Sequence, residues 1–259
     1  MTSNTEIQKD TFKVTSLEEK APGIFLLTMK HDKITNLLIH EIDVHLDTVE
    51  ATEGPVALIT TSSLRKIYSQ GIDFEVFDYN PRELWAFFKA LGKLLGRFTT
   101  VGFPTIAAIN GHCFAGGTIF SMAHDFRVMR NDYGIMCLPE VDIGSDFAPA
   151  LIKTLEAKMP YPAMQRMTVF GEKIFPKTGV KLKVLDKIVP KDQLIPYSVK
   201  LAQQLAPKAI HRKALQEMKR VLYREVHEAG RHRPCGDVEC YFYFRDNKNK
   251  ILAEMGIKQ

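Results

Sequence analysis

The chain has 259 residues, 45% of them hydrophobic, and carries a formal net charge of +5 at pH 7. A chain of this length and apolar content can bury one substantial core together with an appendage. The basic residues are dispersed and form no patch with interleaved aromatic side chains, so we expect no nucleic-acid partner. No apolar run reaches the roughly 18 residues that mark a membrane span, so we expect no span either.

Apolar runs alternate with helical patterns along the first half of the chain. Short apolar runs, typical of buried strands, lie at 24–29, 56–60, 105–109, 126–129 and 134–136. Helices are expected at 38–50, at 82–98, where Pro81 favours a first helical turn, and at 115–123. The alternation predicts an α/β fold.

A glycine pair opens the helix expected at 115–123. Asn110 and Gly111 end the strand before it, and Gly116 and Gly117 leave backbone N–H groups that no side chain shields. Such groups at the positive end of a helix favour a negative charge. A phosphate-binding loop would need a lysine where Gly117 stands, so the nucleotide interpretations fail. Tight packing of helix on strand is the alternative, and this segment alone does not decide between the two.

The second informative segment is the apolar run that ends at Pro139 and Glu140. Val141, Ile143 and Phe147 follow the carboxyl group in sequence. Apolar surroundings disfavour the ionised form of a carboxyl group and raise its pKa, as a group that takes up and releases protons requires. The alternative interpretation is an exposed turn carboxylate after a proline.

The chain becomes more helical and more charged after Pro190, with helical patterns at 201–205, 213–224 and 237–255. Leu215, Met218, Leu222 and Val226 form one apolar stripe in this region. The stripe packs either into the protein's own core or against another subunit, and spacing alone does not separate these two arrangements.

The cysteines and the two termini bear on the compartment. Cys113 and Cys137 lie in apolar motifs and are expected to be buried thiols, whereas Cys235 and Cys240 lack the second pair that a zinc site needs. We therefore expect no metal site and a reducing, intracellular compartment. Neither terminus carries a targeting signal that can be read from the sequence.

Three parts of the chain share their order and spacing with the motifs of a known superfamily. Residues 65–74 are similar to its F-S-x-G-x-D loop, and residues 107–117 to its A-x-x-N-G-x-x-x-G-G-G segment. Residues 123–130 and 139–144 are similar to its C-D-x-R-x strand and its P-E-x-x-x-G turn. Together they resemble the enoyl-CoA hydratase/isomerase, or crotonase, superfamily, and the resemblance covers nearly the whole chain.

The resemblance implies a crotonase-like ββα spiral core with the CoA site at residues 1–195, and a C-terminal helical region at 196–259 that covers the core and builds trimers. A homotrimer or a hexamer is therefore expected, with an acyl-CoA as the substrate. Coenzyme A is then part of the substrate, and no separate cofactor is implied.

The resemblance also implies a reaction centre. Glu140 would be the catalytic acid and base, and the backbone N–H groups of Ile72 and Gly116 would form an oxyanion hole for the thioester enolate. The residues implied to bind CoA or substrate are Lys33, Ile34, Arg65, Lys66, Ser69, Gly71, Asp73 and Gly117.

The number of carboxyl groups points to the reaction. Hydratases of the family use a second glutamate two residues beyond the glycine run, where this chain has Ile119. One carboxyl group cannot easily direct hydration, but it can take a proton from C2 of a 3-enoyl-CoA and return it at C4. The chain is thus most similar to the monofunctional Δ3,Δ2-enoyl-CoA isomerases of plants and protists.

Such an isomerase would serve the β-oxidation of unsaturated fatty acids, in the mitochondrial matrix or the peroxisome. Two alternatives stay open on the sequence alone. The first is a catalytically idle subunit with a structural or assembly role. The second is another crotonase reaction, such as hydration of an enoyl-CoA.

A few residues depart from the family pattern or invite a second role. Ala115 replaces the first glycine of the triple, a change that we expect only to stiffen the entry to the helix. Asp142 could face the same pocket as Glu140 but is expected to be solvated. His112 and His124 are expected to be structural.

Overall fold

The central element is a mixed β-sheet in a computed structural model that describes residues 12–74 and 80–232. Within the described residues this main sheet has six strands in the order β1-β2-β4-β7-β9-β11. Their bounds are β1 (Thr15–Ala21), β2 (Ile24–Met29), β4 (Ala57–Ser62), β7 (Thr105–Ile109), β9 (Phe126–Arg130) and β11 (Lys187–Val189). The first two strands pair antiparallel, and all the others pair parallel.

Two smaller sheets lie beside the main one and bring distant segments together. One consists of β10 (Met136–Cys137), β8 (His112–Phe114) and β5 (Ile67–Ser69), in that order and all parallel. The other pairs β3 (Lys33–Ile34) with β6 (Gly71–Ile72), again in parallel. Because only Gln70 separates β5 from β6, the motif at residues 65–74 connects the two small sheets.

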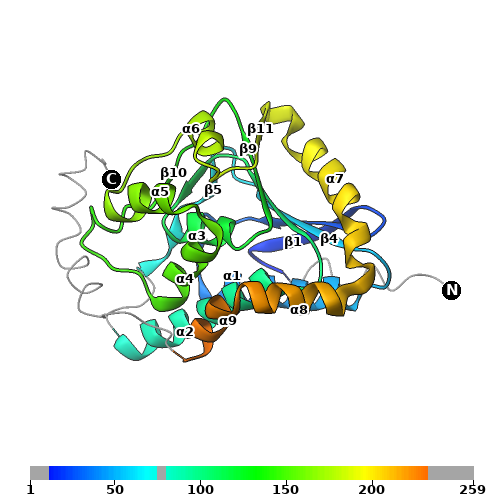
Figure 1. Ribbon diagram of the computed structural model, residues 1–259, viewed down its shortest axis with the longest axis horizontal. Coiled ribbons are helices and arrows are strands. Elements are labelled where there is room, and N and C mark those ends of the chain that lie inside the picture. The colour runs from blue at the N-terminus through cyan, green and yellow to red at the C-terminus, as the bar shows by residue number, and fades with distance from the viewer. Residues whose placement is uncertain (1–11, 75–79, 233–259) are drawn as a thin grey trace.

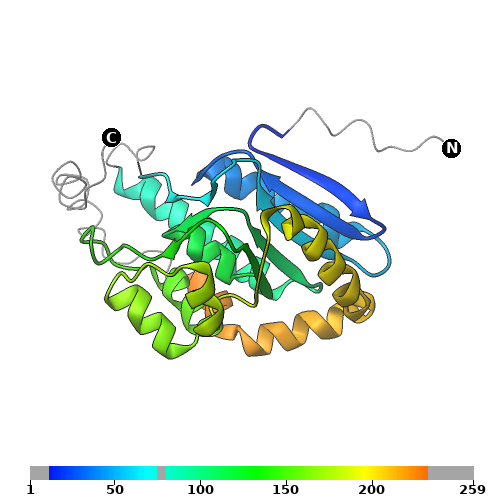
Figure 2. The same cartoon turned by 90° about the horizontal axis from the view of Figure 1, so that it is seen from above.

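Helices cover both faces of the main sheet (Figures 1 and 2). The helices of the described part are α1 (Asn36–Ala51), α2 (Pro81–Thr100), α3 (Gly116–Met122), α4 (Pro149–Lys158), α5 (Tyr161–Met164), α6 (Pro176–Lys181), α7 (Leu194–Leu205), α8 (Arg212–Leu222) and α9 (Arg224–His232). None of these described helices is both long enough and apolar enough to cross a membrane.

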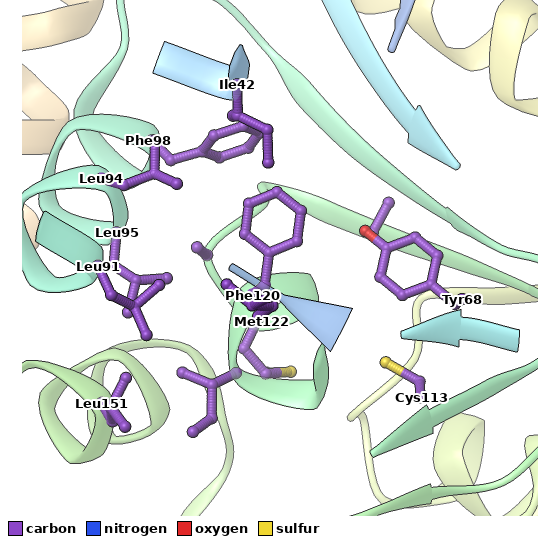
Figure 3. Packing of buried hydrophobic residues seen from close by; sticks show 14 of the residues in the cluster. Ile42, Tyr68, Leu91, Leu94, Leu95, Phe98, Cys113, Phe120, Met122 and Leu151 are labelled. Carbon is purple, nitrogen blue, oxygen red and sulfur yellow. The ribbon is translucent and has the colours of Figure 1, made fainter. Parts of the chain in front are cut away.

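The main sheet separates two apolar cores, because alternate side chains of each strand point to opposite faces. Ile24 and Leu26 of β2 pack with Leu194 and Ala202 of α7 in the smaller core. Phe25, Leu27 and Met29 of the same strand face the larger core, formed with α1, α2 and α3. Figure 3 shows part of this larger core, with Phe98 of α2 against Phe120 of α3 at a ring-centroid distance of 5.2 Å. Burial on both faces explains the continuous apolar runs in the sequence.

The strands and helices expected before residue 140 are confirmed, with small shifts of their ends. Hydrogen bonds fix the starts of two of the helices: the Thr35 side chain accepts from the N–H of Leu38, and the Asn80 side chain accepts from that of Arg82. The last expected strand begins at Met136 instead of residue 134, after Gly134 turns the chain with a φ of 112°.

The helix expected at 213–224 is confirmed as α8, which ends at Leu222 because the chain turns at Tyr223 before α9 begins. The turn divides the apolar stripe: Val226 is fully buried, whereas Met218 and Leu222 are 68% and 70% exposed. The stripe therefore does not form one face packed into the protein's own core. Residues 237–255, Cys235 and Cys240 lie outside the described residues.

The buried residue of α8 is a lysine. The Lys219 ammonium lies 2.6 Å from Asp125, at the start of β9, and also donates to the carbonyl oxygen of Phe103 at 2.9 Å. Lys158 of α4 lies 3.7 Å from the same carboxylate, which also accepts from the N–H of Thr105. The neighbouring cations hold the pKa of Asp125 below its usual value despite its burial. One carboxylate thus anchors two helices to the main sheet at the starts of β7 and β9.

The substitution Asp125→Asn keeps the shape of this side chain but leaves two largely buried ammonium groups without their counter-charge. We expect it to lower the free energy of unfolding by about 3 kcal/mol, as removal of one partner of a buried ion pair does. Urea denaturation followed by circular dichroism measures this change. The matched control is Asp47→Asn, since Asp47 is exposed and Arg97 keeps its bonds to Asp43 and Glu50. A loss in Asp125→Asn no greater than in this control would contradict the anchoring role.

Candidate active site

The small β3–β6 sheet brings together several of the residues singled out by sequence. Lys33 pairs with Gly71, and Ile34 pairs with Ile72. Asp73 comes next, its N–H donating to the carbonyl oxygen of Ile34 at 3.1 Å and its carboxylate lying 3.2 Å from the Lys33 ammonium. Segments that are nearly 40 residues apart in the chain are therefore joined at this point by backbone pairing and one ion pair.

The loop that contains Gly71 lies against the first turn of α3. A Cβ atom on Gly71, whose φ is +95°, would lie 2.9 Å from the backbone nitrogen of Gly116. A Cβ atom on Gly116 would lie 3.4 Å from the backbone nitrogen of Ile72. The two backbone amides implied in the oxyanion hole therefore lie close together, and a side chain at position 71 would not fit between loop and helix.

Ser69 and Gly117 form the next layer of the same contact. A Cβ atom on Gly117 would lie 2.6 Å from the Cβ of Ser69, so a side chain there would force the helix away from the loop. The buried Ser69 hydroxyl donates to the carbonyl oxygen of Asp32 and accepts from the N–H of Gly71 at 3.2 Å. Ser69 thereby shapes the loop that presents Ile72.

The start of α3 is fixed from its other side by Thr118 and Cys137. The Thr118 hydroxyl lies 2.6 Å from the carbonyl oxygen of Cys113 and 3.0 Å from the carbonyl oxygen of Cys137. The N–H of Ala115 also donates to the carbonyl oxygen of Cys137. Sequence reasoning did not single out Thr118. Its only signal is a small hydroxyl side chain directly after the glycine pair.

Ala115 is more than a minor departure from the family's glycine. It has φ 47° and ψ −123°, a backbone conformation that side chains with a Cβ rarely adopt. The expectation of a merely stiffened helix entry was therefore incomplete, because the replacement leaves backbone strain directly before the first turn of α3.

Glu140 lies in the turn that follows β10. Cys137, the last residue of that strand, accepts from the N–H of Ala115 directly before α3, and Glu140 follows three residues later in the chain. The Glu140 side chain is buried, and its Oε2 atom has no hydrogen-bond partner among the residues that the structure describes. Burial raises its pKa to about 8, as its apolar surroundings predict. A carboxyl group in this condition can both release and accept a proton near neutral pH.

The other acidic and imidazole groups considered from the sequence have different surroundings. Asp142 is exposed, with its carboxylate packed beside Gly171, as expected for a solvated group. His112 shares a hydrogen bond of 2.8 Å with the Tyr133 hydroxyl. The ring of the fully buried His124 shares a hydrogen bond with Thr60, which confirms a structural place for this histidine.

The two remaining CoA candidates lie at the surface. Arg65 and Lys66 are exposed in the loop before β5, and the Lys66 ammonium lies 5.3 Å from the centre of the Tyr133 ring. Their proposed role in binding stays a prediction. Across the described part of the chain, no group of three or more His, Cys, Asp or Glu side chains is placed to hold a metal ion.

Comparison with known proteins adds a family to this geometry. The family model for enoyl-CoA hydratase/isomerase matches residues 19–253. The peroxisomal enoyl-CoA delta isomerase 1 of Arabidopsis thaliana is 28% identical over 215 residues, which cover 80% of this chain and 89% of that protein. The mitochondrial enoyl-CoA delta isomerase 1 of Homo sapiens is 26% identical over 178 residues, covering 66% of this chain and 59% of that protein.

Solved structures show the same fold. The crystal structure of human mitochondrial delta3-delta2-enoyl-CoA isomerase superposes with a TM-score of 0.78 at 20% identity, covering 93% of this chain and 99% of that one. An enoyl-CoA hydratase/isomerase family protein from Pseudomonas syringae superposes with a TM-score of 0.76 at 22% identity, covering 84% and 95%. These likenesses confirm the predicted crotonase-like architecture.

The raised pKa of Glu140 makes stability depend on pH. The folded protein keeps this proton up to about pH 8, whereas the unfolded chain releases it near the ordinary value of 4.5. The free energy of unfolding therefore falls as pH rises between these values, by at most about 1.4 kcal/mol per pH unit from this group. We expect Glu140→Gln to become steadily more stable relative to the wild type across this window and to show no further relative gain above it.

Urea denaturation at a series of pH values from 5 to 9 measures this difference. Asp142→Asn is the matched control, because its carboxylate is exposed on the same turn. A constant difference between Glu140→Gln and the wild type over the whole range would show that the Glu140 pKa is not raised.

The strain at Ala115 predicts that Ala115→Gly is stabilising. Glycine adopts a positive φ without steric cost, and an unfavourable conformation of another residue costs of order 1–3 kcal/mol. Part of this gain is offset by the greater freedom of glycine in the unfolded chain. We expect a net increase of about 1 kcal/mol in the free energy of unfolding, measured by urea denaturation. Destabilisation by Ala115→Gly would show that the alanine is unstrained.

Proposed function

Because the chain belongs to the enoyl-CoA hydratase/isomerase family, whose model covers residues 19–253, we propose that it is an enoyl-CoA isomerase. It moves the double bond of a 3-enoyl-CoA to the 2-position. The names of relatives from Arabidopsis thaliana and Homo sapiens, all enoyl-CoA delta isomerases, support this reaction. The observation that carries the proposal is the buried carboxyl group of Glu140, with its unpartnered Oε2 oxygen and raised pKa.

In the proposed mechanism, the ionised Glu140 takes a proton from C2 of the 3-enoyl chain. The electrons of the broken C–H bond pass toward the thioester carbonyl, and a dienolate forms. The N–H groups of Ile72 and Gly116 donate hydrogen bonds to the negative oxygen. Loss of one such donor typically costs about 10²–10³ in rate. The protonated Glu140 then returns the same proton to C4, which leaves the double bond between C2 and C3 and restores the carboxylate.

Isomerisation is favoured over hydration by what occupies the position of the second acid. Ile119, which stands there in this chain, is fully buried in the larger core. Asp142, the nearest acidic residue in sequence to Glu140, is exposed beside Gly171. Neither residue supplies a second acid or base to activate water, so the site is suited to proton transfer by one group.

The remaining parts of the proposal concern binding and assembly. Lys33, Ile34, Arg65, Lys66, Ser69, Gly71, Asp73 and Gly117 are proposed to bind the CoA ester or to shape its site. Coenzyme A is part of the substrate, and the reaction as proposed needs no other cofactor. The protein is proposed to form a homotrimer or hexamer and to act in the oxidation of unsaturated fatty acids. The names of the relatives favour a peroxisomal or mitochondrial location.

Parallel incubation with a 3-enoyl-CoA and a 2-enoyl-CoA tests the reaction. We expect conversion of the first and no hydration of the second. Chromatography of the CoA esters measures both reactions. Glu140→Gln should lower kcat by about 10²–10⁴, the usual contribution of a general acid–base group, while CoA-ester affinity is retained. Asp142→Asn, the matched control, should keep wild-type turnover.

The other outcomes of this assay have definite meanings. Hydration of the 2-enoyl-CoA would show that the protein is a hydratase and contradict the proposed isomerase activity. Binding of CoA esters without conversion of either would indicate a catalytically idle member of the family. Wild-type turnover in Glu140→Gln would show that another group moves the proton.

A further inference from the structure

A continuous chain of hydrogen bonds crosses the interior beside the two proposed oxyanion amides. The Tyr68 hydroxyl lies 2.8 Å from the Thr60 hydroxyl, which lies 2.7 Å from Nε2 of His124. Nδ1 of His124 lies 2.9 Å from the carbonyl oxygen of Phe120. All three polar side chains are 0% exposed. Polar groups buried this deeply are costly unless each has a partner, and here each has one.

The direction of every bond in this chain follows from its last member. A carbonyl oxygen only accepts, so Nδ1 of His124 carries the hydrogen that meets Phe120. Burial lowers the pKa of His124 to about 3, so the ring is neutral and its Nε2 is an acceptor. Thr60 therefore donates to His124, and its oxygen accepts from Tyr68. One tautomer and one set of rotamers satisfy the whole chain.

This chain of hydrogen bonds joins the two elements that carry the proposed oxyanion donors. Tyr68 lies in β5, directly before the loop that presents Ile72. His124 follows α3, whose first residue is Gly116, and bonds back to Phe120 within that helix. Thr60 belongs to β4 of the main sheet, so both elements are attached to one point of the sheet.

Aromatic packing holds the imidazole in place from the other side. The ring of His124 lies 4.4 Å from that of Phe98 and 5.0 Å from that of Phe120, between centroids. Figure 3 shows Phe98, Phe120 and Tyr68 in this part of the larger core. The ring is therefore confined by apolar contacts and held by two hydrogen bonds, which gives it a single orientation.

The helix is short, and its surroundings fix its position. It spans only Gly116–Met122, and no side chain in the described residues caps its N-terminus. A helix this short is not stable by itself, so tertiary contacts determine where it lies. Thr118 fixes its beginning, and His124 fixes its end.

We infer that Tyr68, Thr60 and His124 are positioning residues, which set the separation and direction of the Ile72 and Gly116 N–H groups in the proposed isomerase. The chain of bonds needs the hydroxyl of Tyr68 and the imidazole of His124. The family motifs have phenylalanine where Tyr68 stands and cysteine where His124 stands, and phenylalanine has no hydroxyl to donate. The expected loss of kcat rests on the proposed function. The expected change at the carbonyl group of a bound CoA ester does not, because it needs no turnover.

Four variants test the inference: Tyr68→Phe, Thr60→Val, His124→Cys and the double variant Tyr68→Phe/His124→Cys. Thr99→Val is the matched control, since Thr99 is equally buried but its hydroxyl only donates to the helix carbonyl of Leu95. Each protein is assayed with a 3-enoyl-CoA. The carbonyl stretching frequency of a bound 2-enoyl-CoA is recorded by infrared difference spectroscopy, which needs no turnover.

We expect Tyr68→Phe and Thr60→Val to lower kcat about tenfold, less than the ~10²–10³ that follows loss of a whole donor, with KM nearly unchanged. The carbonyl frequency should move toward its value in free solution. The double variant should be no worse than its worse single variant, because both substitutions break the same chain. Thr99→Val should change neither readout.

Two results separate this inference from the proposed function. If the wild type lowers the carbonyl frequency but converts no 3-enoyl-CoA, the isomerase proposal fails, and the positioning role is still judged by the frequency in the variants. If Tyr68→Phe and Thr60→Val leave both the frequency and kcat at wild-type values, the positioning role is overturned. His124→Cys leaves more space in the core. If this variant fails to fold, the near-isosteric variants Tyr68→Phe and Thr60→Val decide whether the positioning role holds.

Discussion

The arrangement of the site depends on one close approach, between the loop that ends in Ile72 and the first turn of α3. Backbone and small side-chain atoms meet there, and a Cβ on Gly71, Gly116 or Gly117 would stand within 3.1 Å of a neighbouring atom. The three glycines let the loop and the helix approach closely, as the proposed pair of backbone N–H donors requires. Backbone donors are also fixed in direction by the fold, which suits a site that must stabilise charge as it develops.

Three buried carboxyl groups illustrate how surroundings decide what an acid can do. Glu41 accepts hydrogen bonds from Thr15 and from two backbone N–H groups, and its pKa is lowered despite its burial. Asp125 lies between the ammonium groups of Lys219 and Lys158, and its pKa is lowered too. The Glu140 carboxyl group has no cation beside it and only a backbone hydrogen bond within its own residue, its Oε2 atom has no partner among the described residues, and burial raises its pKa. The first two carboxylates stabilise the fold, whereas the unfavourable burial of the third agrees with the proton-transfer role proposed for it.

Most strands and helices of the fold, and the surroundings of Glu140, could be predicted from the sequence because their signals are local. The strand at Thr105–Ile109 is an uninterrupted apolar run, and the raised pKa of Glu140 followed from its neighbours. The division of the apolar stripe between α8 and α9 could not be predicted. Lys219 of α8 faces inward because it pairs with Asp125, which precedes β9 and is remote in sequence. Periodicity alone treats lysine as an outward residue. The strained φ of Ala115 was likewise invisible, because it results from contacts at both ends of the turn rather than from the alanine itself.

The polar core around His124 shows a second limit of reading residues singly. Taken alone, a buried histidine beside an aspartate in sequence is a structural group, and that interpretation is confirmed. Its significance comes from Tyr68 and Thr60, which are remote in sequence but satisfy the same imidazole. A phenylalanine and a cysteine would fill such a space by packing, which tolerates small displacements of helix and loop. Directed hydrogen bonds tolerate them less, since their strength falls steeply with angle and distance. Hydrogen bonds in place of packing therefore restrict the relative position of the helix and the loop more strictly, at the point where the two backbone donors are proposed to converge.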